Sequence, residues 1–310
     1  MVKAMYNYNH LYYFYVAAKS GGVTNAAKHL RISQPSLSSQ LKVLERALDL
    51  KLFQKVGRSN QLTRAGAIVY GFCRQIFEIS EQMSEALTKR VPSANRRIHI
   101  GVSDEVERSF VVEVVSQFLK MQSPTTRPRV TIVAGTQSQL AERLKFRELD
   151  IIITELGMSD PDLVNLSRIE APVVLACPKK WKVSSNLMHV QAAAAIAEIS
   201  GREISEWVMP STKFKLRSEI DRFFEANELK GRIAIESDVL ASLVRSVSDG
   251  LGMGFFPLLY ISNEHNLRIL GPKSGYWKYR LWLVCNPQNR EDVLIQAFAK
   301  VFRNVGTRGI

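Results

Sequence analysis

The sequence predicts a small helical unit with one short hairpin, then one long helix, then a two-lobed α/β body. Apolar positions recur at helical spacing through the first 90 residues, and strands alternate with helices from residue 96 onward. The 310 residues amount to about twice a typical domain, and 46% of them are hydrophobic. This globular composition excludes extensive disorder.

Charge is distributed unevenly along the chain. The net charge is +13, yet residues 1–92 carry 13 Lys/Arg against 5 Asp/Glu. A small basic unit on a milder body suggests a polyanion partner at that end. A merely solvated basic surface is the open alternative.

No segment predicts a membrane span or an export signal. The most apolar run, 192–197, is far shorter than the ~18 residues that a spanning helix needs, and polar residues interrupt the start of the chain at Asn7, Asn9 and His10. We therefore expect a cytoplasmic protein. The cysteines are odd in number and lie in apolar patterns, which predicts reduced, buried thiols at Cys73, Cys177 and Cys285.

Three short helices are expected first. One occupies the first 20 residues and ends at Gly21-Gly22; Thr24 is a candidate N-cap for the next, 25–30. Ser33 is the expected N-cap of the third, which has Pro35 in its first turn. The second and third helices, joined by a tight turn, make a helix-turn-helix.

The outer face of the third helix is polar. An apolar stripe runs along its other face through Leu37, Leu41, Leu44 and Leu48. Short donors and acceptors of this kind suit base edges and phosphates in a DNA groove. The outward residues are Gln34, Ser36, Ser38, Ser39, Gln40, Lys42 and Val43.

A short hairpin is predicted over 54–62. Its basic tip, with Lys55 and Arg58, could act as a wing against the minor groove or the phosphates, or be a solvated basic loop.

A long helix is predicted from about Arg64 to Arg90, with an apolar stripe close to heptad spacing. Pairing with a second copy would bury this stripe, although it could also pack on the chain's own body. The stripe residues are Ile68, Phe72, Ile76, Ile79, Met83 and Leu87.

The pattern from residue 96 onward predicts two α/β lobes with a mostly parallel sheet. We expect the C-terminal segment to return and complete the first lobe. Expected helices span 105–121, 139–146, 190–199, 217–225, 239–247 and 291–302; expected strands span 98–102, 130–134, 151–153, 172–177, 207–209, 233–235 and 279–285. Gly250, Gly252 and Gly254 precede a further strand without a following helix, which favours a packing turn over a dinucleotide loop. The open sheets place the default ligand site between the lobes.

The N-terminal motifs resemble the winged helix-turn-helix of LysR-type transcriptional regulators. The resemblance rests on the run from Asn25 to Ser38, on Leu52-Phe53 and on Leu62-Thr63 with Gly66, and the later glycines are similar to the family's effector-domain signature. Within the family, 7–14 and 50–66 look most like the NhaR subgroup, which is linked to sodium–proton antiport and responds to sodium. Ser39 departs from the commoner pattern, which has Arg there.

The resemblance implies a DNA-binding regulator with a periplasmic-binding-protein-like effector domain, and not an enzyme. It implies contacts with promoter DNA through Gln34, Pro35, Ser36, Ser38, Ser39, Lys42 and Arg58. It also implies a homodimer that assembles into a tetramer, with RNA polymerase as a further partner. The expected organisation is a winged helix-turn-helix over 1–63, a linker helix over 64–91, a hinge over 92–95, lobe I over 96–171 and 271–310, and lobe II over 172–270.

Effector positions of the family correspond here to Ser103, Asp104, Glu105, Gly135, Thr136, Gln137 and Ser138, with Gly252 as a further lining residue. The acids Asp104, Glu105 and Glu107 have two interpretations. Either they complement the dipole of the following helix, or they help to bind a hard cation such as sodium. No resident cofactor or metal site is expected.

Two competing functions remain from the residues alone. One is a cytoplasmic small-molecule-binding α/β protein or enzyme with a basic N-terminal arm, which would bind DNA weakly and without sequence preference. The other is a helical scaffold that works through the long helix. The sequence offers no motif in favour of the enzyme: it has no Gly-x-Ser-x-Gly nucleophile elbow, and its histidines lack the spacing of metal ligands.

Overall fold

The computed structural model describes residues 6–56, 59–89, 96–181, 206–229, 231–261, 264–272 and 274–307. Chain contacts divide it into two compact units. Unit 1 comprises Met1–His99, Gln122–Thr131 and Ser138–Asp150, and unit 2 comprises Ile100–Met121, Ile132–Gln137 and Ile151–Ile310. Within the described ranges, no helix has both the length and the apolar character needed to cross a membrane.

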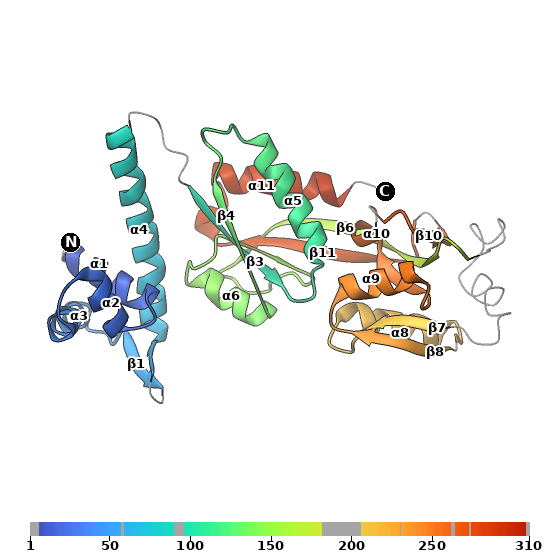
Figure 1. Ribbon diagram of the computed structural model, residues 1–310, viewed down its shortest axis with the longest axis horizontal. Coiled ribbons are helices and arrows are strands. Elements are labelled where there is room, and N and C mark those ends of the chain that lie inside the picture. The colour runs from blue at the N-terminus through green and yellow to red at the C-terminus, as the bar shows by residue number, and fades with distance from the viewer. Residues whose placement is uncertain are drawn as a thin grey trace. The chain divides into compact units, whose positions relative to one another are not determined.

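Unit 1 begins with the expected helices (Figure 1): α1 (Tyr8–Lys19), α2 (Val23–Leu30) and α3 (Gln34–Leu48). Ser33 caps α3 as predicted, because its side chain accepts the N–H of Ser36 at 3.2 Å. The prediction for Thr24 is wrong. The N-cap of α2 is Gly22, whose φ of 142° suits glycine, and no side chain caps this helix.

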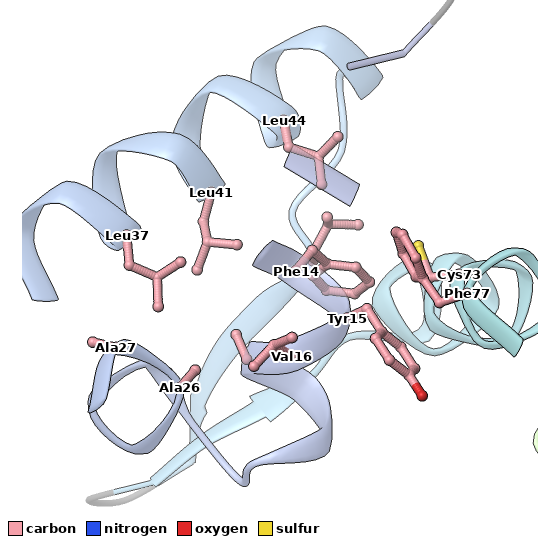
Figure 2. Close-up of a cluster of buried hydrophobic side chains, with 12 residues drawn as sticks. Phe14, Tyr15, Val16, Ala26, Ala27, Leu37, Leu41, Leu44, Cys73 and Phe77 are labelled. Carbon is pink, nitrogen blue, oxygen red and sulfur yellow. The ribbon is translucent and has the colours of Figure 1, made fainter. Parts of the chain in front are cut away.

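The helices of the first 89 residues share one core, a cluster of buried apolar side chains (Figure 2). Leu37, Leu41 and Leu44 of α3 point toward Phe14 of α1, and Ala26 and Ala27 let α2 approach closely. Cys73 and Phe77 from the long helix α4 (Arg64–Lys89) complete the cluster. The first half of α4 therefore belongs to the helix-turn-helix core.

The predicted hairpin is present as β1 (Phe53–Val56) and β2 (Ser59–Leu62), which pair antiparallel. The long helix matches its predicted span to within one residue, since α4 ends at Lys89. The predicted hinge 92–95 and the predicted helix 190–199 lie outside the described residues.

The body is a mixed α/β structure, as predicted. Its large sheet has the strand order β10-β6-β11-β5-β3-β4, with β9 also paired to β6. The strands are β3 (Arg97–Ser103), β4 (Arg129–Gly135), β5 (Ile151–Thr154), β6 (Val164–Pro178), β9 (Gly254–Pro257), β10 (Leu267–Leu270) and β11 (Trp277–Cys285). A second sheet pairs β7 (Glu206–Pro210) with β8 (Arg232–Ser237) in parallel.

The prediction of a mostly parallel sheet is wrong for the large sheet. β11 pairs antiparallel with both β5 and β6, and β6 pairs antiparallel with β9 and β10, whereas β3 and β5 are parallel. The cause is β6, a single strand of 15 residues of which the sequence pattern predicted only 172–177. Residues 164–173 of this strand pair with the returning strand β11, and residues 173–178 pair with β9 and β10.

The helices of the body are α5 (Arg108–Met121), α6 (Gln137–Lys145), α8 (Lys215–Ala226), α9 (Leu240–Asp249), the short α10 (Leu258–Ile261) and α11 (Val293–Gly306). Helix α11 lies beside α5 (Figure 1), so the tail packs on the first lobe as predicted. Phe298 and Phe302 of α11 meet Phe118 and Phe110 of α5 edge-on. The three cysteines are free and buried, as expected.

Candidate nucleic-acid interface and effector site

The third helix separates a buried face from an exposed one. Leu37 and Leu44 are at most 1% exposed, so the opposite side of α3 faces away from the core. On that side the structure places Gln34, Pro35, Ser36, Ser39 and Lys42 in exposed positions, with Ser38 half-buried. A row of short polar side chains over the first two turns of a helix has the shape and chemistry to enter a DNA major groove.

The electrostatics of this unit suit a polyanion. Helices α2, α3 and α4 carry no acidic residue in their first turns. Their N-terminal N–H groups and the positive ends of their dipoles are therefore not neutralised by carboxylates, which favours phosphate.

The hairpin is held to α3 by Glu45, a residue that sequence reasoning did not single out. Its Oε1 accepts the N–H groups of Leu52 at 2.8 Å and Phe53 at 3.4 Å, and its Oε2 lies 2.9 Å from Lys51 Nζ. Burial by itself would raise the pKa of Glu45, but the hydrogen bonds from Leu52, Lys51 and Phe53 outweigh it and hold that pKa below its ordinary value. The basic tip with Arg58 lies outside the described residues.

Thr63 and Gly66 join the hairpin to α4. Thr63 Oγ1 donates to the carbonyl of Lys51 at 2.6 Å and accepts the N–H of Gly66 at 2.9 Å. A Cβ at Gly66 would lie 2.1 Å from the Leu52 carbonyl oxygen. Only glycine allows the backbone of α4 to approach the strand this closely.

The apolar stripe of α4 is exposed in the single chain. Ile68, Phe72, Ile76, Ile79 and Met83 are 38–64% exposed, and the side chain of Leu87 lies outside the described residues. Beside the stripe, α1 and α4 form a groove of about 420 Å³ lined by aromatic and polar side chains, including Tyr8, Tyr12 and Phe77. So much exposed apolar surface on one helix is typical of an interaction face.

One candidate effector residue, Ser103, is hydrogen-bonded to a buried carboxylate in unit 2. Ser103, 2% exposed at the end of β3, donates through Oγ to Glu155 Oε2 at 3.1 Å. Tyr279 of β11 donates to Glu155 Oε1 at 3.1 Å and receives the hydroxyl of Tyr260 at 3.3 Å. Glu155 follows β5 and is 3% exposed, so these residues form a polar network inside an apolar core.

Glu155 has an unusual protonation state. Burial, and then the nearby charge of Glu105, raise its pKa to about 7 against the opposing hydrogen bonds from Tyr279 and Ser103. The network therefore exchanges a proton near neutral pH.

The acids around residue 105 do not lie in the first turn of a helix. Helix α5 begins at Arg108, later than the predicted residue 105, so Asp104 and Glu105 lie before its first turn. Glu107, directly before the helix, accepts the N–H of Ser109 through Oε1 at 3.2 Å, as an acid that complements the start of α5 would. By contrast, Glu105 Oε2 accepts the N–H of Lys215 at 3.2 Å, the first residue of α8, whose N-cap Phe214 provides no side-chain bond. Glu105 thus caps a helix distant in sequence. Asp104 is exposed and pairs with Arg108 at 3.3 Å.

The second group of candidate residues lies partly beside the first. The N–H of Asp104 donates to the carbonyl of Gly135 at 3.0 Å, and Gln137 Nε2 donates to the Leu156 carbonyl at 3.2 Å. Thr136 and Ser138 are exposed. In the described part of the chain, no three His, Cys, Asp or Glu side chains gather as they would around a metal ion.

Gly252 has a packing role, as does Gly254. A Cβ at Gly252 would lie 2.6 Å from the Glu206 carbonyl oxygen, and one at Gly254 would lie 2.8 Å from that of Val208. These glycines let the chain before and within β9 lie against β7, which confirms the predicted packing turn.

A winged helix-turn-helix, a long helix and a two-lobed α/β domain together define a transcriptional regulator that binds DNA and an effector. Comparison with known proteins identifies the kind of regulator. Residues 8–67 match "Bacterial regulatory helix-turn-helix protein, lysR family", and residues 93–307 match "LysR substrate binding domain". The chain belongs to the LysR family.

Several relatives are themselves regulators. The chain is 31% identical to the transcriptional activator protein NhaR of Escherichia coli (strain K12) over 149 residues, 48% of each chain. The match therefore spans about half the length of this curated relative. The chain is 25% identical to the HTH-type transcriptional regulator AlsR of Bacillus subtilis (strain 168) over 300 residues, 96% of each.

Solved structures share the fold over nearly the whole chain. A full-length variant of OxyR from Pseudomonas aeruginosa aligns with a TM-score of 0.64 at 17% identity, covering 96% of this chain and 95% of that one. ArgP from Mycobacterium tuberculosis aligns with a TM-score of 0.65 at 14% identity, covering 98% of each.

Proposed function

We propose that the chain binds a two-part promoter site as a dimer, with α3 of each copy in a major groove. The observation that carries the proposal is the exposed polar face of α3 opposite its buried leucines. Gln34, Pro35, Ser38 and Ser39 would meet base edges, and Ser36 and Lys42 the phosphates. Arg58 would contact the minor groove or the backbone.

The exposed stripe of α4 supports the dimer. A second copy of α4 would cover these side chains, and the groove beside α1 offers further apolar surface to it. Two helix-turn-helix units held in register would select two half-sites at a fixed spacing. Dimers of dimers would then give the tetramer expected from the family resemblance.

The effector is proposed to bind at the loops around Ser103–Glu105 and Gly135–Ser138. The likeness to NhaR over half the chain supports sodium as a candidate effector and a sodium–proton antiporter gene as a candidate target. Carboxylate, hydroxyl and carbonyl oxygens of this kind are the ligands that a hard cation prefers. The regulator would act in the cytoplasm, together with RNA polymerase.

Footprinting on the DNA beside its own gene tests DNA recognition. Gln34→Ala should lower affinity for the protected site by the equivalent of about 1–3 kcal/mol and relax its sequence preference. Lys42→Gln should weaken binding to all duplexes and reduce the slope of log K against log salt by about 1. Lys120→Gln, an exposed charge on α5, is the matched control. Equal affinity of the wild-type chain for random duplex would overturn the proposal.

Titration with NaCl against KCl at constant ionic strength tests the sodium effector. The tryptophan fluorescence of the full chain and its footprint should respond to sodium alone, and Glu105→Gln should weaken the response. Identical responses to the two salts would remove sodium as the effector and leave DNA recognition intact.

A further inference from the structure

Helix α4 carries a buried arginine whose partners come mainly from distant parts of the chain. Arg74 is 5% exposed. Its Nε and Nη2 both donate to the carbonyl of Arg147, Nε at 3.0 Å, and Nη2 lies 3.2 Å from Asp150 Oδ1. Its Nη1 lies 2.6 Å from His99 Nδ1 and 3.5 Å from Glu78. All of these residues belong to unit 1.

His99 lies between the cation and the carboxylate of this cluster. Its Nδ1 is 2.6 Å from Arg74 Nη1 and 3.3 Å from Asp150 Oδ2, and its Nε2 is 4.0 Å from Glu78. Burial by itself would raise the pKa of Asp150, but hydrogen bonds from His99 and the charge of Arg74 keep that pKa below its ordinary value. A buried cation is thus matched by an ionised carboxylate, a carbonyl and an imidazole.

The backbones around this cluster are in close contact as well. A Cβ at Gly71 would lie 1.8 Å from the carbonyl oxygen of Phe146. The Arg147 guanidinium lies 4.3 Å from the centre of the Phe72 ring and donates to Gln75 Oε1 at 3.2 Å. Arg147 itself has a φ of 59°. We call the contact between 71–78 of α4 and 146–150, together with His99, the α4 clasp.

Two elements connect the α4 clasp to the candidate effector residues. Strand β3 contains His99 and ends at Ser103, and helix α6 begins at Gln137 and ends one residue before Phe146. A nine-residue helix is about 14 Å long. A displacement of the candidate effector residues along either element would therefore move a partner of Arg74, His99 within β3 or Arg147 just after α6.

From this geometry we propose that Arg74 is a positioning residue, which couples the effector domain to α4 and so sets the spacing of the two DNA-reading helices. The inference deepens the proposed function and rests on it. Arg74 touches neither DNA nor effector. Its role is to hold α4 in one orientation on the ends of β3 and α6, the kind of discrete arrangement that a coupled equilibrium requires.

The test uses the full chain with Arg74→Met, Arg74→Lys and Gly71→Ala. Lys120→Gln is the control, because it removes an exposed charge from α5, which belongs to neither segment of the α4 clasp. Two measurements are made: hydrogen exchange by segment, and affinity for a single half-site and for two half-sites of varied spacing. The half-sites come from the footprint of the wild-type chain.

We expect Arg74→Met and Gly71→Ala to speed exchange at least tenfold in both 71–78 and 146–150, but not in 34–48. Half-site affinity should stay within about twofold of the wild type, whereas the preference for one spacing should fall at least tenfold. Arg74→Lys keeps the charge but loses the forked geometry, so it should fold and show a smaller loss. Lys120→Gln should match the wild type.

Unchanged exchange in both segments would overturn the α4 clasp itself. Faster exchange with an unchanged preference for one spacing would overturn the positioning role. The positioning role would also fail if Arg74→Lys lowered the affinity for a single half-site as much as it lowered the preference for one spacing. If the wild-type chain bound no DNA site specifically, the proposed function and the positioning role would both fail, while hydrogen exchange would still report on the contact.

Discussion

Replacing Glu155 by glutamine should remove a pH dependence from the stability of the effector domain. The pKa of Glu155 is about 7 in the folded chain, against an ordinary value of 4.5. Because the folded-state pKa is raised, the proton on Glu155 stabilises the folded chain. This contribution to the free energy of unfolding is fully present below the unfolded pKa and is lost as pH rises through about 7. The difference between the two pKa values corresponds to about 3 kcal/mol of stability, of which about 2 kcal/mol is lost between about pH 5.5 and about pH 8.

Urea denaturation followed by tryptophan fluorescence measures this effect. All four tryptophans lie in the effector domain, so the signal does not report on the helix-turn-helix: Trp181, Trp207, Trp277 and Trp282. The wild-type midpoint should fall over this pH range, and Glu155→Gln should flatten that part of the dependence. Its amide can still accept from Tyr279 and donate to Ser103.

Glu291→Gln is the matched control, because this carboxylate is 88% exposed. It should retain the wild-type pH dependence. A Glu155→Gln protein whose midpoint still fell by the wild-type amount would show that the proton is taken up elsewhere, and the reasoning from burial would be wrong.

Three further changes test other parts of the structure. Gly66→Ala should destabilise the helix-turn-helix by about 1–3 kcal/mol, measured by circular dichroism melting, because its Cβ would meet the Leu52 carbonyl; an unchanged melting temperature would contradict this. Glu45→Gln should cost about 1 kcal/mol at neutral pH and progressively less in acid, since the lowered pKa of Glu45 gives stability that is present above its ordinary value of 4.5 and is lost as pH falls through the lowered pKa. Ile79→Asp, at a side chain 64% exposed, should convert a dimer to a monomer in sedimentation without unfolding the chain. An unchanged sedimentation mass would show that the apolar stripe of α4 is not the dimer interface.

Local signals predicted the first 89 residues well. A capping serine with a proline in the first turn, and an uninterrupted apolar stripe, fix helix boundaries without reference to the rest of the chain, so α3 and α4 appear where expected. The cap of α2 was predicted wrongly because the backbone of Gly22 occupies that position with a φ of 142°. Its N–H bonds the carbonyl of Ala17 in α1 at 3.0 Å, and its carbonyl accepts the N–H of Ala26 in α2 at 3.1 Å.

The body was predicted less well because its key features depend on pairing. Nothing within 164–178 indicates whether one strand or two should form, since that depends on whether a partner as long as β11 returns beside it. Glu155 and Arg74 were missed for the same reason. Tyr279 lies 124 residues from Glu155, and Arg147 lies 73 residues from Arg74, so no spacing in the sequence joins them.

The uneven charge of the chain also has a structural cause. In the described part of residues 6–89, three carboxylates have partners within the fold: Glu45 braces the hairpin, Glu78 pairs with Arg74 and Glu81 pairs with Arg97. Asp49 terminates α3 with a φ of 55°, at the end opposite its polar first turns. None of these acids lies in the first turn of α3, which carries no carboxylate. A phosphate backbone that approached this end of the helix would therefore meet no acidic side chain of α3 there.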